Sequence, residues 1–180
     1  MSKAAPIPHA CNVLSLRQGE RHLYHFAVNK SSAVPAGQWE VAADKPLPAN
    51  VVSRDWRLLI RSRLDIAWMP PESVFLRAVQ LPACAPAELA GMIEFQLEKL
   101  SPMPPAQVVW TVESVAHPDT TQQTALVTIA ARSAVEAFVD KLEQGGYMAD
   151  RIELPMVRRL LAKPVQGELL RIVLDGSGAQ

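Results

Sequence analysis

The residues of this chain best suited to chemistry are its four histidines and two cysteines, which could bind a metal ion or act in catalysis. His22 and His25 lie three positions apart in an apolar run typical of a strand. Because strand side chains alternate between two faces, these imidazoles should point in opposite directions. His9 and Cys11 share a face, but they lie at the start of the chain without further ligands beside them. We therefore predict no metal site.

Motifs for a nucleophile or a bound phosphate are also missing from the sequence. It contains no G-x-S-x-G or S-x-x-K, and neither Cys11 nor Cys84 has a neighbouring His in a recognised enzyme pattern. Two cysteines are too few for a disulfide framework. We therefore expect Cys11 and Cys84 to be small buried hydrophobic side chains. His117 lies in "AHPDT", a predicted solvated loop, and the glycine-rich stretches match no phosphate-binding loop. We predict no catalytic and no cofactor-binding residue.

One charged group has a spacing that suggests a binding face. Arg54, Arg57 and Arg61 recur at intervals of three and four residues, in a segment whose apolar residues have helical spacing after Ser53. With Ser53 as the N-cap, the arginines would share the side opposite the apolar stripe. A charged helix face is usually only solvated, and the alternative is that it contacts an acidic partner. These three arginines are our candidate partner-binding residues.

Composition limits the class of protein. The chain has 180 residues, 49% of them hydrophobic, which is enough to bury a substantial core. Its 18 basic residues balance 18 acidic ones, so it lacks the positive field that binds nucleic acid or an anionic membrane. No apolar run approaches the roughly 20 residues of a membrane span, and the first ten residues do not resemble a signal peptide. We expect a globular protein of the cytosol that does not bind nucleic acid.

The first part of the chain predicts strands and one helix. Residues 1–10 are rich in proline and alanine, and we expect a flexible arm. Two apolar runs around Arg17–Glu20 predict a β-hairpin in which Gly19 takes a positive φ. A third strand is expected from Trp39, followed by the helix that begins after Ser53.

Helices and strands alternate in the rest of the chain. After a strand over residues 73–81, a helix is expected to start at Pro86 and stop before Pro102. Ser133 and Glu136 form the S-x-x-E capping box of another helix. The remaining predicted elements are paired strands over residues 107–113 and 124–131, a strand over 149–155, a helix over 155–163 and a final strand over 168–178. This order predicts an α/β fold with a mixed sheet and helices on its faces.

Trp39, Trp56, Trp68 and Trp110 lie inside the apolar patterns of these elements, and we expect all four in the core or on a sheet face.

The segment "FLRAVQLPACAPAELAGMIEFQLEKLSPMPPAQVVWTVE" resembles the cytoplasmic actin-like family of bacterial type II secretion protein L and the type IV pilus protein PilM. That family has a strand ending in Leu-Pro, an acidic helix, a Thr/Ser-Pro-Phe-Pro turn and a strand with an aromatic residue. The similarity covers residues 74–155, and Met103 replaces the usual Phe. The matching positions here are Leu81-Pro82, Glu94, Glu98, Ser101-Pro102-Met103-Pro104 and Val109-Trp110.

The resemblance implies a ribonuclease H-like domain, which is half of an actin-like ATPase fold. We expect a single such domain over residues 11–168, with residues 169–180 as the start of a second half that is truncated or absent. Nucleotide-binding members place an Asp in the first hairpin, and the related nucleases need a carboxylate on the first strand. This chain has Asn12, Ser15 and Gln18 there. The resemblance therefore implies no cofactor and no enzyme, the alternative being a nucleotide-dependent enzyme of the same superfamily.

By the same resemblance, the chain would be a non-catalytic scaffold of a type II secretion or type IV pilus assembly platform. Its expected partners are the secretion or assembly ATPase and inner-membrane platform proteins, with a homodimer as a further possibility. Its expected location is the cytoplasmic face of the bacterial inner membrane, with no membrane segment in this chain.

Overall fold

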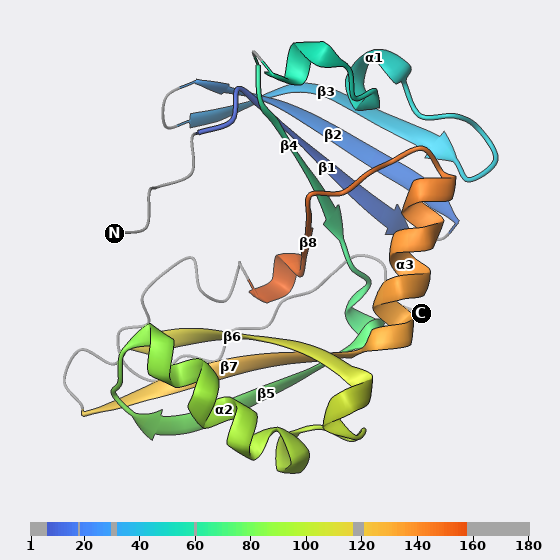
Figure 1. Cartoon of the computed structure of the whole chain (residues 1–180). Coiled ribbons are helices and arrows are strands. Elements are labelled where there is room, and N and C mark those ends of the chain that lie inside the picture. The colour runs from blue at the N-terminus through green and yellow to red at the C-terminus, as the bar shows by residue number, and fades with distance from the viewer. Residues whose placement is uncertain (1–6, 18, 30–31, 60, 117–120, 158–180) are drawn as a thin grey trace. The chain divides into compact units, whose positions relative to one another are not determined.

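The computed structural model describes residues 7–17, 19–29, 32–59, 61–116 and 121–157 (Figure 1). The chain divides into two compact units, where the sequence predicts a single domain over residues 11–168. The first unit contains residues up to 69 and from 139 onward, and the second contains residues 70–138. Most of the predicted arm, the final strand and residues 169–180 lie outside the described residues.

The first unit is built on a mixed five-stranded sheet in the order β3-β2-β1-β4-β8. β1, β4 and β8 run parallel, and β2 is antiparallel to both β1 and β3. The predicted hairpin is confirmed, with Gly19 at a φ of 84° in its turn. The strands are β1 (Ala10–Arg17), β2 (Glu20–Asn29), β3 (Ser32–Ala42), β4 (Arg63–Trp68) and β8 (Arg151–Glu153).

Strand β4 is a central strand of this sheet that the sequence did not predict. Two of its six residues, in the sequence "RLDIAW", are charged. Arg63 and Asp65 lie two positions apart, on one face of the strand, where the guanidinium neutralises the carboxylate. The two charged residues suggested an exposed segment, but they belong to a strand inside the sheet.

The predicted helix after Ser53 is wrong. The structure has a short helix α1 (Ala49–Val52), for which Ser53 is the extended C-cap, and then the 3₁₀ turn η1 (Trp56–Leu59). The Arg63 guanidinium explains why α1 stops, because it donates to the carbonyls of Val51, Val52 and Ser53. Trp56 is also a correction, since this side chain is 67% exposed and not in the core.

The second unit has an antiparallel sheet in the order β5-β7-β6, and α2 (Pro86–Leu100) lies across one of its faces (Figure 1). Pro86 opens this helix as predicted, and the Glu88 carboxylate accepts a hydrogen bond from the backbone N–H of Ala85. Met103 of the proline turn packs against the same core. The strands are β5 (Val74–Pro82), β6 (Val108–Ala116) and β7 (Gln122–Ala131), with 3₁₀ turns η2 (Pro71–Ser73) and η3 (Pro105–Gln107). The core is formed by Leu81, Leu89, Ile93, Leu97, Val108, Ala125, Val127 and Ile129.

Helix α3 (Arg132–Gln144) leads from the second unit back into the first. It begins at Arg132, so Ser133 lies inside the first turn and is not the N-cap that the sequence predicts. Its end is as predicted, with Gly146 at a φ of 78°. Residues 155–157 are helical, and the rest of the predicted helix lies outside the described part. None of the described helices has both the length and the apolar character needed to cross a bilayer.

Candidate functional site

The densest group of polar side chains in the first unit surrounds Asp65, which is 2% exposed. Its Oδ1 accepts hydrogen bonds from Asn12 Nδ2 and Arg63 Nε, both at 2.8 Å. Its Oδ2 accepts from Arg63 Nη2 at 2.9 Å and from Arg54 Nη2 at 3.0 Å. An ionised carboxylate has about four acceptor positions, so those of Asp65 are all occupied.

The parallel register of β1 and β4 brings Asn12 beside Asp65. The Asn12 amide N–H₂ donates to Asp65 and to the Val51 carbonyl, which leaves its Oδ1 as the acceptor for His25 Nδ1 at 2.7 Å. His25 must therefore donate from Nδ1. Burial, followed by the charge of Arg63, lowers the pKa of His25. The lowered pKa favours the neutral imidazole that carries its proton on Nδ1.

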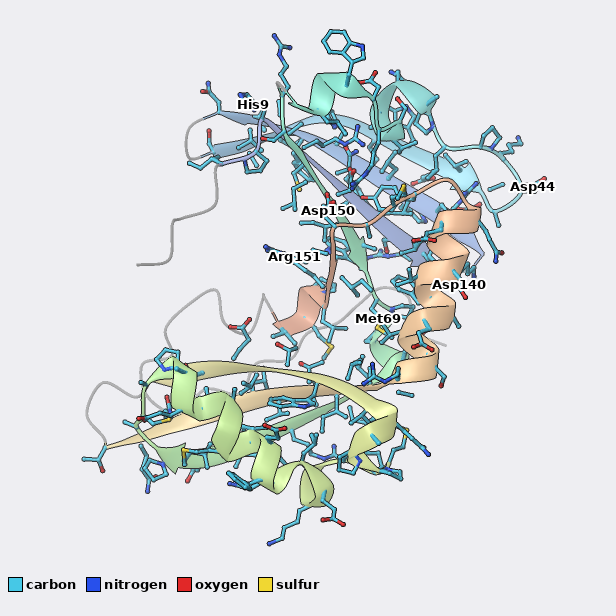
Figure 2. All side chains as sticks on the ribbon, in the orientation of Figure 1. His9, Asp44, Met69, Asp140, Asp150 and Arg151 are labelled. Carbon is cyan, nitrogen blue, oxygen red and sulfur yellow. The ribbon has the colours of Figure 1, made fainter. Side chains whose placement is uncertain are left out.

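Arg54 and Asp150 extend this group to the segment before β8, where Figure 2 labels Asp150. Arg54 Nη2 donates to Asp150 Oδ1 at 2.7 Å and to the Met148 carbonyl at 2.8 Å. Asp150 Oδ2 accepts from the backbone N–H of Asp65 at 2.9 Å. Burial lowers the pKa of Arg54, but the hydrogen bond to Asp150 and the carboxylate charges outweigh it and raise the pKa. We call Asn12, Arg54, Arg63, Asp65 and Asp150 the polar cluster.

The polar cluster is poorly suited to catalysis or metal binding. A metal ligand needs an available lone pair, and the donors around Asp65 already use all of its acceptor positions. Asn12 and Asp65 are also the third residues of their strands, in the amino-terminal halves of β1 and β4. Ligands of open α/β sheets usually bind at the carboxyl ends of the strands. The geometry is that of a structural clamp between β1, α1, β4 and the segment before β8.

The three candidate arginines do not lie in one helix. Arg54 follows α1 and belongs to the polar cluster, Arg57 lies in η1, and Arg61 lies beyond η1 and is exposed. The Arg57 side chain is outside the described part of the structure. Their regular spacing does not reflect a helix, because α1 ends at Val52, before the first of them.

His22 and His25 contact different neighbours, as the alternation of strand side chains predicts. His25 contacts Asn12, whereas His22 lies 3.6 Å from the Glu40 carboxylate on β3. Cys84 is half-buried and accepts from Gln123 Nε2, and burial raises the pKa of the Cys11 thiol. Within the described residues, no three His, Cys, Asp or Glu side chains form a group that could hold a metal ion. His117 and Gln18 lie outside the described residues.

A pocket of about 290 Å³ lies in the first unit between the end of α3 and β8. Val139, Leu142 and Ile152 form apolar walls, and Glu143 and Arg151 line it with charge. The pocket is at the lower end of the volumes that small-molecule sites have.

Sequence reasoning missed the most exposed large hydrophobic residue of the described chain, which is Phe95 on α2. Its side chain is 93% exposed, although Ile93 and Leu97 on either side of it are buried in the core. The helical spacing contained this signal, since Phe95 does not fall on the buried stripe.

Comparison with solved structures finds similar folds, among them the two that follow, whereas no family model and no curated protein matches the chain. One is a PilM-PilN type IV pilus biogenesis complex, with a TM-score of 0.61 and 16% identity over 84% of this chain. The other is the cytoplasmic domain of EpsL, an inner membrane component of the type II secretion system of Vibrio cholerae, with a TM-score of 0.52 and 17% identity over 88% of this chain.

These similarities confirm the predicted fold class and the resemblance in fold to the PilM and type II secretion L proteins. The chain spans 49% of the length of the matched chain in the PilM-PilN structure and 60% of that of the EpsL domain. It is therefore an α/β protein with a mixed sheet, similar in fold to these two solved structures.

Proposed function

We propose that this chain is a non-catalytic scaffold domain in the inner-membrane platform of a type II secretion or type IV pilus assembly system. In this role it binds the secretion or assembly ATPase and neighbouring platform proteins, on the cytoplasmic side of the membrane. The observation that carries the proposal is the similarity in fold to two components of such systems. One of them is described as a complex of PilM with PilN, so binding of a second protein is a property of that neighbour.

The polar cluster supports the non-catalytic part of the proposal. By the family resemblance, nucleotide-binding members carry an Asp in the first hairpin and the related nucleases carry a carboxylate on the first strand. The strand β1 has no carboxylate, and its buried amide residue is Asn12. Asp65 beside it is held by two arginines and an amide. Neither residue offers the available oxygen atoms that a metal-bound phosphate requires.

The proposal is tested by titrating the purified chain with the purified assembly ATPase of the same system, and separately with a platform protein. Saturable binding to at least one of them, with a dissociation constant in the micromolar range or below, is the expected result. The absence of binding to both at about 100 μM, which corresponds to less than about 5.5 kcal/mol of binding free energy, would contradict it.

A second measurement addresses the alternative of a nucleotide-dependent enzyme. We expect Mg-ATP to leave the melting temperature unchanged, because a ligand stabilises a protein only when it binds the folded state. A clear, concentration-dependent rise in melting temperature would favour the alternative. Self-association stays a prediction, and sedimentation velocity measures it directly.

A further inference from the structure

Phe95 projects from the outer face of α2 without contributing to the core. Successive residues of a helix are rotated by about 100°, so Phe95 points about 160° away from both Ile93 and Leu97. The buried stripe of α2 is complete without it, since Leu89, Ile93 and Leu97 already fill the sheet face. The fold therefore gives no reason for an aromatic side chain at this position.

The surface next to Phe95 is open. Residues three and four positions away are its neighbours along the helix, and Gly91 is the one four positions before it. A Cβ atom at Gly91 would meet no atom within 4 Å. Phe95 therefore stands beside a gap in the side chains of α2, and a partner could enclose its ring from that side.

The same face of α2 has an excess of negative charge. Glu94 and Glu98 are both exposed and lie four residues apart, a spacing at which like charges repel. Within the described residues, neither carboxylate has an ion-pair partner. The exposed charged residues of α2 are three carboxylates, Glu88, Glu94 and Glu98, against one lysine, Lys99.

We propose that Phe95, with Glu94 and Glu98, is a docking surface for a protein partner that presents an apolar pocket bordered by lysine or arginine. Burial of a protruding aromatic ring is the usual source of affinity in such contacts, and charge at the rim directs association. The excess of carboxylates selects a basic border for the pocket. The inference rests on the proposed function, because it takes the partner from among the assembly proteins.

The test compares variants in titrations with the purified assembly ATPase and with a platform protein. Phe95→Ala should weaken binding of one of them by about 30-fold, as expected for a central aromatic contact. Phe95→Tyr keeps the ring and should bind as the unaltered chain does. The double variant Glu94→Lys and Glu98→Lys should weaken binding by about tenfold, and this difference should shrink at high salt.

Matched controls are Val34→Ala, which removes another exposed apolar side chain, and Glu72→Lys, which reverses another exposed charge. Both should bind as the unaltered chain does. Thermal unfolding of Phe95→Ala should match that of the unaltered chain, because the ring is 93% exposed.

Four other results would overturn all or part of this inference. Unchanged binding of both partners by Phe95→Ala would overturn this inference and leave the proposed function intact. Failure of the unaltered chain to bind either partner would overturn both. If Phe95→Ala altered only self-association in sedimentation velocity, the surface would bind a second copy of the chain, and the inference would be wrong. Stronger binding by the lysine variant would overturn the basic border.

Discussion

The polar cluster of the first unit and the outer face of α2 in the second unit use their charges in opposite ways. In the polar cluster, Asp65 is buried and the Arg63 side chain is only 9% exposed, and the donors and acceptors around them are paired inside the unit. On α2, Glu94 and Glu98 are exposed beside Phe95, with no ion-pair partner among the described residues. The side chains of the polar cluster therefore hold the first unit together. On α2, Phe95, Glu94 and Glu98 make no such contacts within the described part of the chain, and we propose that they bind a partner.

This difference shows why residue type alone is a poor guide to a site. Asp, Arg, His and Asn gathered on neighbouring strands of a mixed sheet suggest catalysis until their hydrogen bonds are traced. Once traced, they satisfy each other. Whether a group can act on a ligand depends on whether the fold has already used it.

The largest expected effect comes from breaking the polar cluster at its centre. Arg63→Ala should destabilise the chain by about 3–5 kcal/mol, because it leaves the buried Asp65 carboxylate short of its main cation. The measurement is the free energy of unfolding in urea, with Arg151→Ala, an exposed member of a surface pair, as the control. A loss below about 1 kcal/mol for Arg63→Ala would show that the cluster is not a clamp.

Substitution on the buried side of α2 is expected to lower the free energy of unfolding by nearly as much. Leu97→Ala removes a side chain that is 3% exposed in the core of the second unit, and it should cost about 2–5 kcal/mol. Urea unfolding of this variant measures the stability of the sheet and helix together. A small effect would mean that α2 is held by something other than this core.

Arg54 and Arg61 provide a matched pair from the arginines that the sequence grouped together. Arg54→Ala should cost about 1.5–3 kcal/mol, because it removes charged hydrogen bonds to Asp65 and Asp150. Arg61→Ala alters an exposed residue and should change the free energy of unfolding by no more than about 0.5 kcal/mol. Equal effects of the two substitutions would contradict the division between them.

His25 should make the polar cluster sensitive to pH. Its folded-state pKa is lowered by burial and by Arg63 below the value of 6.5 expected for the unfolded chain. As the pH falls below 6.5, the unfolded chain therefore binds the proton first, and stability is lost towards the folded-state pKa. Above 6.5 this contribution is complete.

The measurement compares urea unfolding at about pH 7.5 and about pH 5.5 for the unaltered chain and for His25→Gln. The unaltered chain should lose more stability between these two values than the variant does. An identical loss in both would remove His25 as the source.

The smallest expected effect on stability is that of Phe95→Ala, two residues from Leu97. Its ring is exposed, so the free energy of unfolding should change by less than about 0.5 kcal/mol. A loss above about 1 kcal/mol would mean that Phe95 supports the fold, and it would weaken the case for a docking surface.

Local patterns predicted much of the fold correctly. Gly19 marked the first hairpin, Pro86 the start of α2, and Gly146 the end of α3. These features act within a few residues of the chain, through backbone angles and missing N–H groups, and so they can be read in the sequence. The family resemblance over residues 74–155 also led to the correct fold class.

The candidate site could not be predicted in the same way. The arginine spacing at 54, 57 and 61 suggested a helix face, but the Arg63 guanidinium ends α1 at Val52. That contact depends on β4, which the sequence did not indicate because its charges hide a buried strand.

The sequence by itself determined the turns, the caps of α2 and the absence of a carboxylate on the first strand. Only the tertiary structure decided what the polar residues do. Asn12 and Asp65 are 53 positions apart, and the parallel pairing of β1 and β4 makes them neighbours. The exposure of Phe95 likewise depends on which side of α2 faces the sheet. The pairing of strands far apart in the sequence decides which polar side chains become neighbours. A charged side chain can bind a ligand only when those neighbours have not already taken up its hydrogen bonds.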